Sequence, residues 1–293
     1  MRVDVAARAR HLNVRRPATL LWVLLVLACF AANSLLTRLL VSRHLLDPAA
    51  VTITRFAAGA AMLAVILAIY GRASEVVPRW TDWPLLLALA GYAPAISYGY
   101  RFITAAAGTF VFYALVILTM TVAGGVRPTR RALGGAVLAL AGVGVLAFGK
   151  VKGSTPLGVG LLALTGATWG GYSLLLRRRS SPLAANARAF LGVALLLPAL
   201  AWVERDALVW SASGIALGVF MGAVTTALSY ALWARVLPEL SPIEAGTFQL
   251  LVPVLTASGG VLLLGEELSW QLGLSGALVL GGMWLTVRRG GRG

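Results

Sequence analysis

The sequence predicts an all-α membrane protein with ten transmembrane helices, arranged as two inverted five-helix repeats. Three observations predict this fold class: the composition, a series of long uncharged segments, and a similarity between the two halves of the chain. Hydrophobic residues make up 59% of the sequence, charged residues only 12%, and the mean hydropathy is +0.86. Soluble domains carry roughly 25% charged residues. The chain therefore lacks the polar surface that it would need in water, and we expect the lipid bilayer to be its solvent.

Ten apolar segments approach the length of about 20 residues that a membrane-spanning helix requires. Arg55 interrupts the second of these segments and Arg188 the seventh. The connections between them are short, as expected for helices that pack as antiparallel neighbours. The ten expected helices cover residues 17–37, 49–70, 83–100, 102–126, 132–149, 153–176, 183–203, 207–234, 242–265 and 268–287.

Turn chemistry marks the starts of three of these helices. The pairs Asp47-Pro48, Ser181-Pro182 and Ser241-Pro242 each place a proline at the first helical position, directly after a residue that caps helices well. Proline is favoured there because the first helical N–H has no partner within the helix. The first two pairs begin the second helix of each proposed repeat.

The internal similarity divides the chain after residue 152. The tetrapeptide Ala-Gly-Thr-Phe occurs at 107–110 and again at 245–248. Residues 30–38 also align with 169–177, at almost the same spacing. We therefore expect an N-terminal repeat over 1–152 and a C-terminal repeat over 153–293. Weak internal symmetry in a membrane protein is typical of transporters whose binding site lies between the repeats.

The distribution of cationic residues predicts the orientation. If the N-terminus is cytoplasmic, the inner segments carry seventeen Arg residues and the outer segments six Arg and Lys residues. Because cytoplasmic loops are enriched in these residues, we expect both termini on the cytoplasmic side of a bacterial inner membrane. Five helices per repeat is an odd number, so the second repeat enters the membrane from the opposite side. Such repeats favour transport by alternating access.

Composition also argues against several other functions. The net charge of +15 would suggest nucleic-acid binding in a soluble protein, but here the cations lie at the ends of apolar segments. Cys29 is the one cysteine, and His11 and His44 lie outside the apolar segments. We therefore expect no disulfide, no metal site, no catalytic residue and no cofactor, and we interpret the chain as a non-enzyme. A Walker-type phosphate loop is also absent from the sequence, so ATP is not expected to drive it directly.

Three stretches resemble motifs of the drug/metabolite transporter superfamily. They are the small-residue and tryptophan segment 168–173, the segment 245–248 followed by Pro253, and the Gly-Glu turn within 264–270. These stretches are similar to the EamA-type branch, and the patterns of the first and third helices are most similar to YddG-type amino-acid exporters. The first repeat departs from the pattern, because Gly124-Gly125-Val126-Arg127 stands where the second repeat has its Gly-Glu turn.

Candidate binding residues are the polar and aromatic side chains within the expected helices. By the resemblance, Phe30, Tyr98, Tyr113 and Trp169 occupy positions that surround the substrate. Other residues of the same kind either line a cavity or join neighbouring helices by hydrogen bonds, and the sequence leaves both interpretations open. The substrate-binding candidates are Phe30, Asn33, Tyr98, Tyr113, Trp169, Tyr172, Tyr230 and Gln249.

Charged residues within the expected helices are candidates for gating. Arg55 and Arg188 each lie about two turns into the second helix of their repeat. Either they extend to the nearer membrane surface, or they form a gate with an acidic residue such as Glu204, Glu239 or Glu244. Glu244 is the acid that we expect at membrane depth. The first helix contains no carboxylate, so we expect no counter-charge there for a strongly cationic substrate.

These observations favour a secondary transporter that exports amino acids and related small zwitterionic metabolites through a central cavity. The expected partners are the substrate and the lipid bilayer, with no nucleic acid and no requirement for an oligomer. The alternatives are a sugar-phosphate or nucleotide-sugar exchanger, a membrane-embedded enzyme, and a small-solute channel. An exchanger of phosphorylated substrates would need more buried cations than Arg55 and Arg188 provide.

Overall fold

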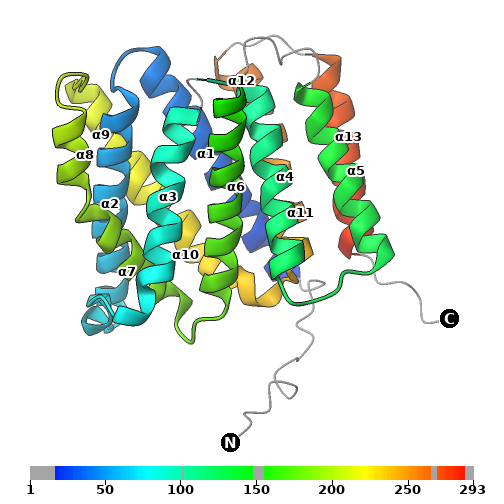
Figure 1. The fold of residues 1–293 in the computed structure, drawn as a ribbon, viewed down its shortest axis with the longest axis horizontal. Helices are drawn as coiled ribbons and strands as arrows, with labels where there is room; N and C mark the ends of the chain where they lie inside the picture. The colour runs from blue at the N-terminus through cyan, green and yellow to red at the C-terminus, as the bar shows by residue number, and fades with distance from the viewer. Residues whose placement is uncertain (1–16, 100–101, 104, 148–154, 265–268, 288–293) are drawn as a thin grey trace, which may run out of the picture.

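The computed structural model describes residues 17–99, 102–103, 105–147, 155–264 and 269–287 as a bundle of helices (Figure 1). Within these ranges the secondary structure is helical, with one isolated bridge between Leu46 and Trp210 and no strand. The all-helical class expected from the sequence is confirmed. Seven of the described helical segments are long and apolar enough to cross a membrane.

The first half of the chain forms one continuous helix for each segment expected there. Two short 3-10 turns, η2 (Ala73–Val76) and η3 (Trp80–Asp82), connect the second helix to the third. The five helices are α1 (Pro17–Ser42), α2 (Pro48–Ile69), α3 (Trp83–Gly99), α4 (Ala105–Ala123) and α5 (Arg130–Ala147).

The second half begins and ends with continuous helices, but each of the three segments between them is interrupted. The outer two are α6 (Pro156–Arg177) and α13 (Trp270–Val287). The first interrupted segment consists of α7 (Pro182–Ala194) and α8 (Leu197–Val203). The second consists of α9 (Ala212–Phe220), the π-helical turn η4 (Met221–Thr226) and α10 (Ala227–Val236). The third consists of α11 (Pro242–Phe248) and α12 (Leu251–Leu264).

The expectation of single regular helices over 183–203, 207–234 and 242–265 was therefore wrong in detail. Pro198 and Pro253 each lie just after a break, and neither has an N–H to bond the carbonyl four residues earlier. In η4, Gly222 packs directly on α2: a Cβ there would lie 2.4 Å from the Arg55 carbonyl oxygen. The widened turn thus occurs where a glycine lets two helices approach closely.

Helices from the two halves pack against each other throughout the bundle. α6 lies between α3 and α4, while α1 packs on α10 and α12. Further principal contacts join α2 to α7 and to η4, and α5 to α13. Figure 1 also shows that α1 begins and α13 ends at the same end of the bundle, which we call the lower end. The ends of α1, α3 and α8 lie at the opposite, upper end.

Asp47 fixes the start of α2 at the upper end. Its Oδ1 accepts hydrogen bonds from the backbone N–H groups of Ala49 and Ala50 at 2.8 and 3.2 Å. Its Oδ2 accepts a further bond from the N–H of Val209 at 2.6 Å, in the segment that precedes α9. One carboxylate therefore caps a helix of the first half and holds a loop of the second half.

Replacing this carboxylate tests its contribution to stability. We expect Asp47→Ala to lower the free energy of unfolding by about 1–2 kcal/mol, because an N-cap and one further hydrogen bond are lost. The measurement is the midpoint of unfolding in mixed micelles with increasing dodecyl sulfate. Asp206→Ala is the matched control, since the Asp206 side chain is 89% exposed and contacts its neighbour Arg205. Equal midpoints for the two variants would contradict this role of Asp47.

Candidate functional site

An aromatic cluster occupies the interior of the bundle, around Trp169 of α6. The Trp169 ring lies 5.7 Å from Phe30 of α1, 5.5 Å from Tyr92 of α3 and 5.3 Å from Tyr230 of α10, measured between ring centroids. It also stacks on Tyr172, one turn along its own helix, at 5.8 Å. Trp169 is only 4% exposed. We call these five residues, together with Gln249, the central cluster.

Gln249 supplies the hydrogen-bond partner of Trp169. The Trp169 Nε1–H donates to Gln249 Oε1 at 2.5 Å, and Gln249 Nε2 donates to the carbonyl oxygen of Ala245 at 3.0 Å. Gln249 lies at the break between α11 and α12 and is buried. The break therefore places an amide, with donor and acceptor groups, beside the Trp169 indole in the interior.

A second polar group joins α1 to the π-helical turn η4. Asn33 donates from Nδ2 to the Thr225 carbonyl oxygen at 3.2 Å, and its Oδ1 accepts from the hydroxyls of Thr225 and Thr226 at 2.6 and 3.0 Å. Arg55 of α2 extends this group, because its Nε donates to Thr226 Oγ1 at 3.1 Å. The Arg55 guanidinium also lies 5.5 Å from the centre of the Phe56 ring. A π-helical turn that makes such contacts is frequently part of a functional site.

Two buried polar atoms next to the central cluster have no hydrogen bond of good geometry within the described residues. They are the Tyr230 hydroxyl, which has the Arg55 guanidinium as a charged neighbour, and Asn186 Nδ2. The other side of the Asn186 amide is occupied, because the Tyr172 hydroxyl donates to Oδ1. Buried polar groups almost always have partners. Two such atoms beside one cluster indicate where a polar ligand or water would bind.

The structure brings most of the predicted binding residues together. Phe30, Trp169, Tyr172, Tyr230 and Gln249 lie in the central cluster, and Asn33 lies one turn from Phe30. The other two predicted residues lie elsewhere. Tyr113 packs on Phe112 at the margin of the cluster, and Tyr98 lies at the upper end of α3.

Sequence reasoning missed Tyr92 and Asn186. Tyr92 lies in α3 with its ring 5.5 Å from Trp169. Asn186 is fully buried in α7, where it accepts from Tyr172. A polar residue within an expected membrane helix was a usable signal for Asn186. No pattern in the sequence distinguishes Tyr92 from an aromatic residue that only fills space.

A buried ion pair lies at the lower end of the bundle. Arg188 of α7 donates from Nε to Asp82 Oδ2 at 2.5 Å, and the two side chains are only 5% and 6% exposed. Arg188 Nη1 also donates to the Glu75 carbonyl oxygen at 3.0 Å. Arg179 reaches the same carboxylate at 3.8 Å and donates to the carbonyl oxygen of Thr81 at 2.5 Å.

A second ion pair joins this group to the start of α7. Arg72 Nε donates to Glu75 Oε1 at 2.6 Å, and Arg72 Nη2 donates to Ser181 Oγ at 2.5 Å. The hydrogen bond from Arg72 holds the pKa of the Glu75 carboxyl below its usual value. We call Arg72, Glu75, Asp82, Arg179 and Arg188 the lower-end ion-pair cluster.

The gating role of the two intramembrane arginines stays a prediction. Arg188 pairs with Asp82 and is buried, and so it does not meet one of the three glutamates considered as partners. Arg55 bonds to a threonine. The glutamates have other contacts or positions: Glu239 accepts from Thr19 Oγ1 at 2.5 Å, Glu244 accepts from the Ser241 N–H at 2.7 Å and so caps α11, and Glu204 lies at the upper end.

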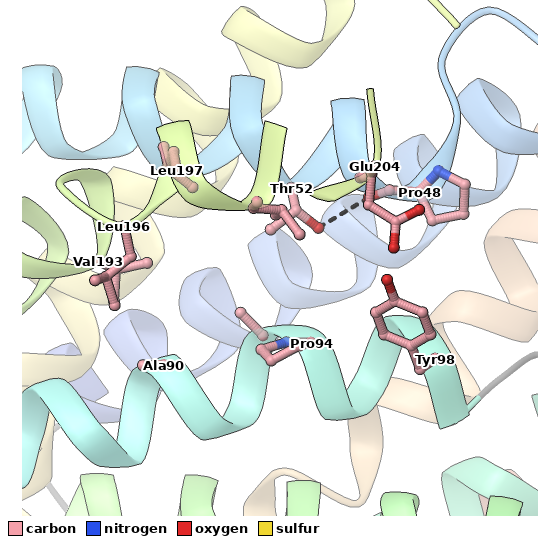
Figure 2. A pocket seen from close by; sticks show the side chains of 12 residues that line it. Pro48, Thr52, Ala90, Pro94, Tyr98, Val193, Leu196, Leu197 and Glu204 are labelled. Carbon is pink, nitrogen blue, oxygen red and sulfur yellow. Dashed lines mark hydrogen bonds between the residues drawn. The ribbon is translucent and has the colours of Figure 1, made fainter. Parts of the chain in front are cut away.

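A pocket of about 190 Å³ lies near the upper end, between α2, α3 and the segment that contains α8 (Figure 2). Its wall is largely apolar and includes Pro94 of α3 and Leu197 of α8. Its polar groups are Thr52, Tyr98 and Glu204. Figure 2 shows the Tyr98 hydroxyl and the Glu204 carboxylate pointing toward each other. We call this the upper pocket.

Comparison with known proteins identifies the family. Residues 156–288 match the profile of the EamA-like transporter family. An uncharacterized protein of Pseudomonas aeruginosa is 38% identical over 275 residues, which cover 92% of this chain and 94% of that protein. The chain belongs to the EamA-like transporter family. The EamA resemblance noted in the sequence is thereby confirmed, while the similarity to YddG-type exporters stays a prediction.

Other relatives of this EamA-family chain are also named as transporters. The uncharacterized transporter YwfM of Bacillus subtilis is 28% identical over 75% of this chain and 78% of its own length. An uncharacterized transporter of Archaeoglobus fulgidus is 26% identical over 92% of this chain and 99% of its own. A solved crystal structure shares the fold, with a TM-score of 0.78 at 21% identity over 92% of this chain and 96% of that chain.

The buried ion pair gives a sharp stability prediction. We expect Asp82→Ala to lower the free energy of unfolding by about 3–5 kcal/mol, because the Arg188 guanidinium is left buried without a counter-charge. The double variant Asp82→Leu/Arg188→Met should lose much less, since it buries no charge. Unfolding in mixed micelles measures both.

The exposed pair Arg205–Asp206 provides the control. Arg205→Ala should cost less than about 1 kcal/mol, because its side chain is 55% exposed and that of Asp206 is 89% exposed. If Asp82→Ala were as mild as Arg205→Ala, or if the double variant were as damaging as the single one, the ion pair would not hold the lower end.

Proposed function

We propose that this EamA-family protein is a secondary transporter that exports amino acids and related small zwitterionic metabolites by alternating access. Family membership and the names of two relatives support transport in general. The observation that carries the specific proposal is the position of the central cluster. It lies where the chain departs from regular helix, with Gln249 at one break and the Asn33 contacts at the π-helical turn.

The chemistry of the cluster supports a small zwitterion with an apolar side chain. In membrane carriers, interrupted helices present backbone and side-chain polar groups to the substrate at mid-membrane. Here the Gln249 amide and the Tyr230 hydroxyl lie among aromatic rings. The rings accommodate an apolar side chain, while amide and hydroxyl groups can bond to both a carboxylate and an ammonium group.

The proposal assigns the chain two inverted repeats, residues 1–152 and 153–293, with ten membrane spans. The helix packing supports this division, because the principal contacts of one half have counterparts in the other. α6 lies between α3 and α4, as α1 lies between α10 and α12, and the pairs α2–α7 and α5–α13 join equivalent helices. The helices outside the seven candidate spans are α3, α4 and α5, with 17, 19 and 18 residues. Their contacts with α6 and α13 support counting them as spans.

Charge supports an orientation with the lower end in the cytoplasm of a bacterial cell and with both termini on that side of the inner membrane. Arg43 and Arg205 lie in loops of the upper end. Lower-end segments carry many more arginines, in accord with the enrichment of cytoplasmic loops in Lys and Arg. Those described at the lower end are Arg72, Arg79, Arg127, Arg130, Arg131, Arg177, Arg178, Arg179 and Arg235.

In this orientation the lower-end ion-pair cluster closes the cytoplasmic side. Export then requires the Arg188–Asp82 pair to separate so that substrate can enter from the cytoplasm. A phosphorylated substrate is less favoured, because a phosphate would need several cations near the site. Arg188 is neutralised by Asp82, which leaves Arg55 as the arginine beside Asn33, Thr225 and Thr226. The proposal assigns transport to a single chain, because one chain contains the whole central cluster.

Exchange in proteoliposomes tests this proposal. We expect purified protein to exchange internal unlabelled amino acids for external labelled ones, with apolar amino acids such as leucine and phenylalanine preferred. Trp169→Ala and Gln249→Ala should each lower the exchange rate by at least about tenfold, equivalent to about 1.4 kcal/mol. The control is Trp202→Ala, because Trp202 is 71% exposed on α8 and lies outside the cluster.

Protein that is folded by gel filtration but exchanges no amino acid would remove the substrate class. Equal loss in all three variants would show that the central cluster is not the site. Counterflow also separates a carrier from a channel, because only a carrier accumulates label against an equal external concentration.

A further inference from the structure

The upper pocket has the features of a second binding site, apart from the central cluster. Its wall is formed by the beginning of α2, the second half of α3 and residues 193–204 around α8. Pro94 and Leu196 of this wall are exposed, so the pocket opens sideways from the bundle. A protein that spans the bilayer would present this opening to lipid, close to the upper membrane surface.

Among the described residues that line this pocket, Glu204 carries the charge, and its carboxylate makes no hydrogen bond or ion pair with another described residue. The nearby cation Arg205 is engaged elsewhere: it lies 3.8 Å from Asp206, stacks 5.0 Å from the Trp202 ring and donates to the Trp202 carbonyl oxygen. Asp47 is occupied by three backbone N–H groups. Glu204 is therefore a half-buried carboxylate without a counter-charge among these neighbours.

The electrostatic surroundings favour a cation in this pocket. Glu204 is the C-cap residue of α8, and the C-terminal end of a helix adds partial negative charge. The start of α2 borders the pocket with partial positive charge, but the Asp47 carboxylate already occupies its free amides. The Tyr98 hydroxyl points toward Glu204 from the opposite wall and adds a polar group beside the carboxylate (Figure 2).

Size and lining define the ligand further. The volume of about 190 Å³ is below the roughly 300–1,000 Å³ of sites for drug-sized molecules. The apolar wall suits a short hydrocarbon group. A phospholipid headgroup would also bring a phosphate, and the described residues of the lining include no Arg or Lys to bind one. These limits favour a small amine over a lipid.

We propose that the upper pocket binds a small organic cation, with its ammonium group against Glu204 and its hydrocarbon group on the wall formed by Pro94, Leu197 and Leu200. The assignment does not depend on the proposed transport of amino acids. It identifies a counter-charge for cationic compounds outside the first helix, at a place where such a compound could enter from the upper half of the bilayer.

Equilibrium dialysis with labelled hexyltrimethylammonium tests this assignment on the full-length protein in dodecyl maltoside. We expect one saturable site per chain. Glu204→Gln should raise the Kd at least about tenfold, because the isosteric amide removes the charge and little else. Asp206→Asn removes the same charge two residues away, from a side chain that is 89% exposed, and should change the Kd less than about twofold. Leu200→Trp, which fills the pocket and keeps Glu204, should also weaken binding.

Three results would overturn the proposal. The first is an unchanged Kd in folded Glu204→Gln protein, or equal losses in Glu204→Gln and Asp206→Asn. The second is binding of neutral hexanol that shows the same dependence on Glu204 as binding of the cation. The third is displacement of the cation by phosphatidylethanolamine but not by phosphatidylglycerol in mixed micelles, which would assign the pocket to a lipid headgroup. Because the readout is binding, a failure of amino-acid exchange would leave these results unaffected.

Discussion

The structure depends on one constraint: a polar group inside an apolar bundle must find its partner within the protein, because lipid supplies none. Several of the contacts that meet this constraint join the two halves of the chain. Asn33 of α1 bonds to η4, and Arg188 of α7 bonds to Asp82 before α3. These pairs determine which helices lie side by side in the interior. They also explain why polar residues occur in segments that are otherwise almost wholly apolar.

The same constraint links the helix interruptions to function. Where a proline removes an N–H, the freed carbonyl must be bonded by another group, as when the Val252 N–H donates to the Gln249 carbonyl oxygen at 3.0 Å. The Gln249 side chain is then directed to Trp169. The interruption between α11 and α12 thus holds the Gln249 side-chain amide in the interior, while the backbone carbonyl of Gln249 keeps a hydrogen bond. We infer that the chain uses this arrangement to present polar groups to a substrate that is otherwise surrounded by aromatic rings.

Much of the fold could be predicted from the sequence, because the length of an apolar segment and a proline at its start are local properties. The ten expected segments each correspond to one helix or to one interrupted helix, and Pro48, Pro182 and Pro242 each begin a helix as expected. The π-helical turn could not be predicted, since it depends on the close approach of Gly222 to α2. That contact joins residues far apart in the chain, and no local pattern encodes it.

The candidate site was predicted unevenly for the same reason. Trp169, Tyr172 and Gln249 stand out as polar or aromatic residues in apolar segments, and the structure places them together. The partner of Arg188 could not be found in this way. Asp82 lies in a connection before α3, and its burial becomes apparent only when the start of α3 is packed against α7. Charge pairing is a property of the assembled bundle.

We propose that the lower end, where Arg188 pairs with Asp82, opens during each transport cycle. The most direct measurement joins two residues beside this pair, Thr81 and Arg179, whose contact spans the closed end. Both would be replaced by cysteine in a Cys29→Ser background and cross-linked with a short bis-maleimide, with the singly substituted proteins as controls. The account predicts that cross-linking stops amino-acid exchange in proteoliposomes while labelling of either single cysteine does not. Undiminished exchange by fully cross-linked protein would contradict it.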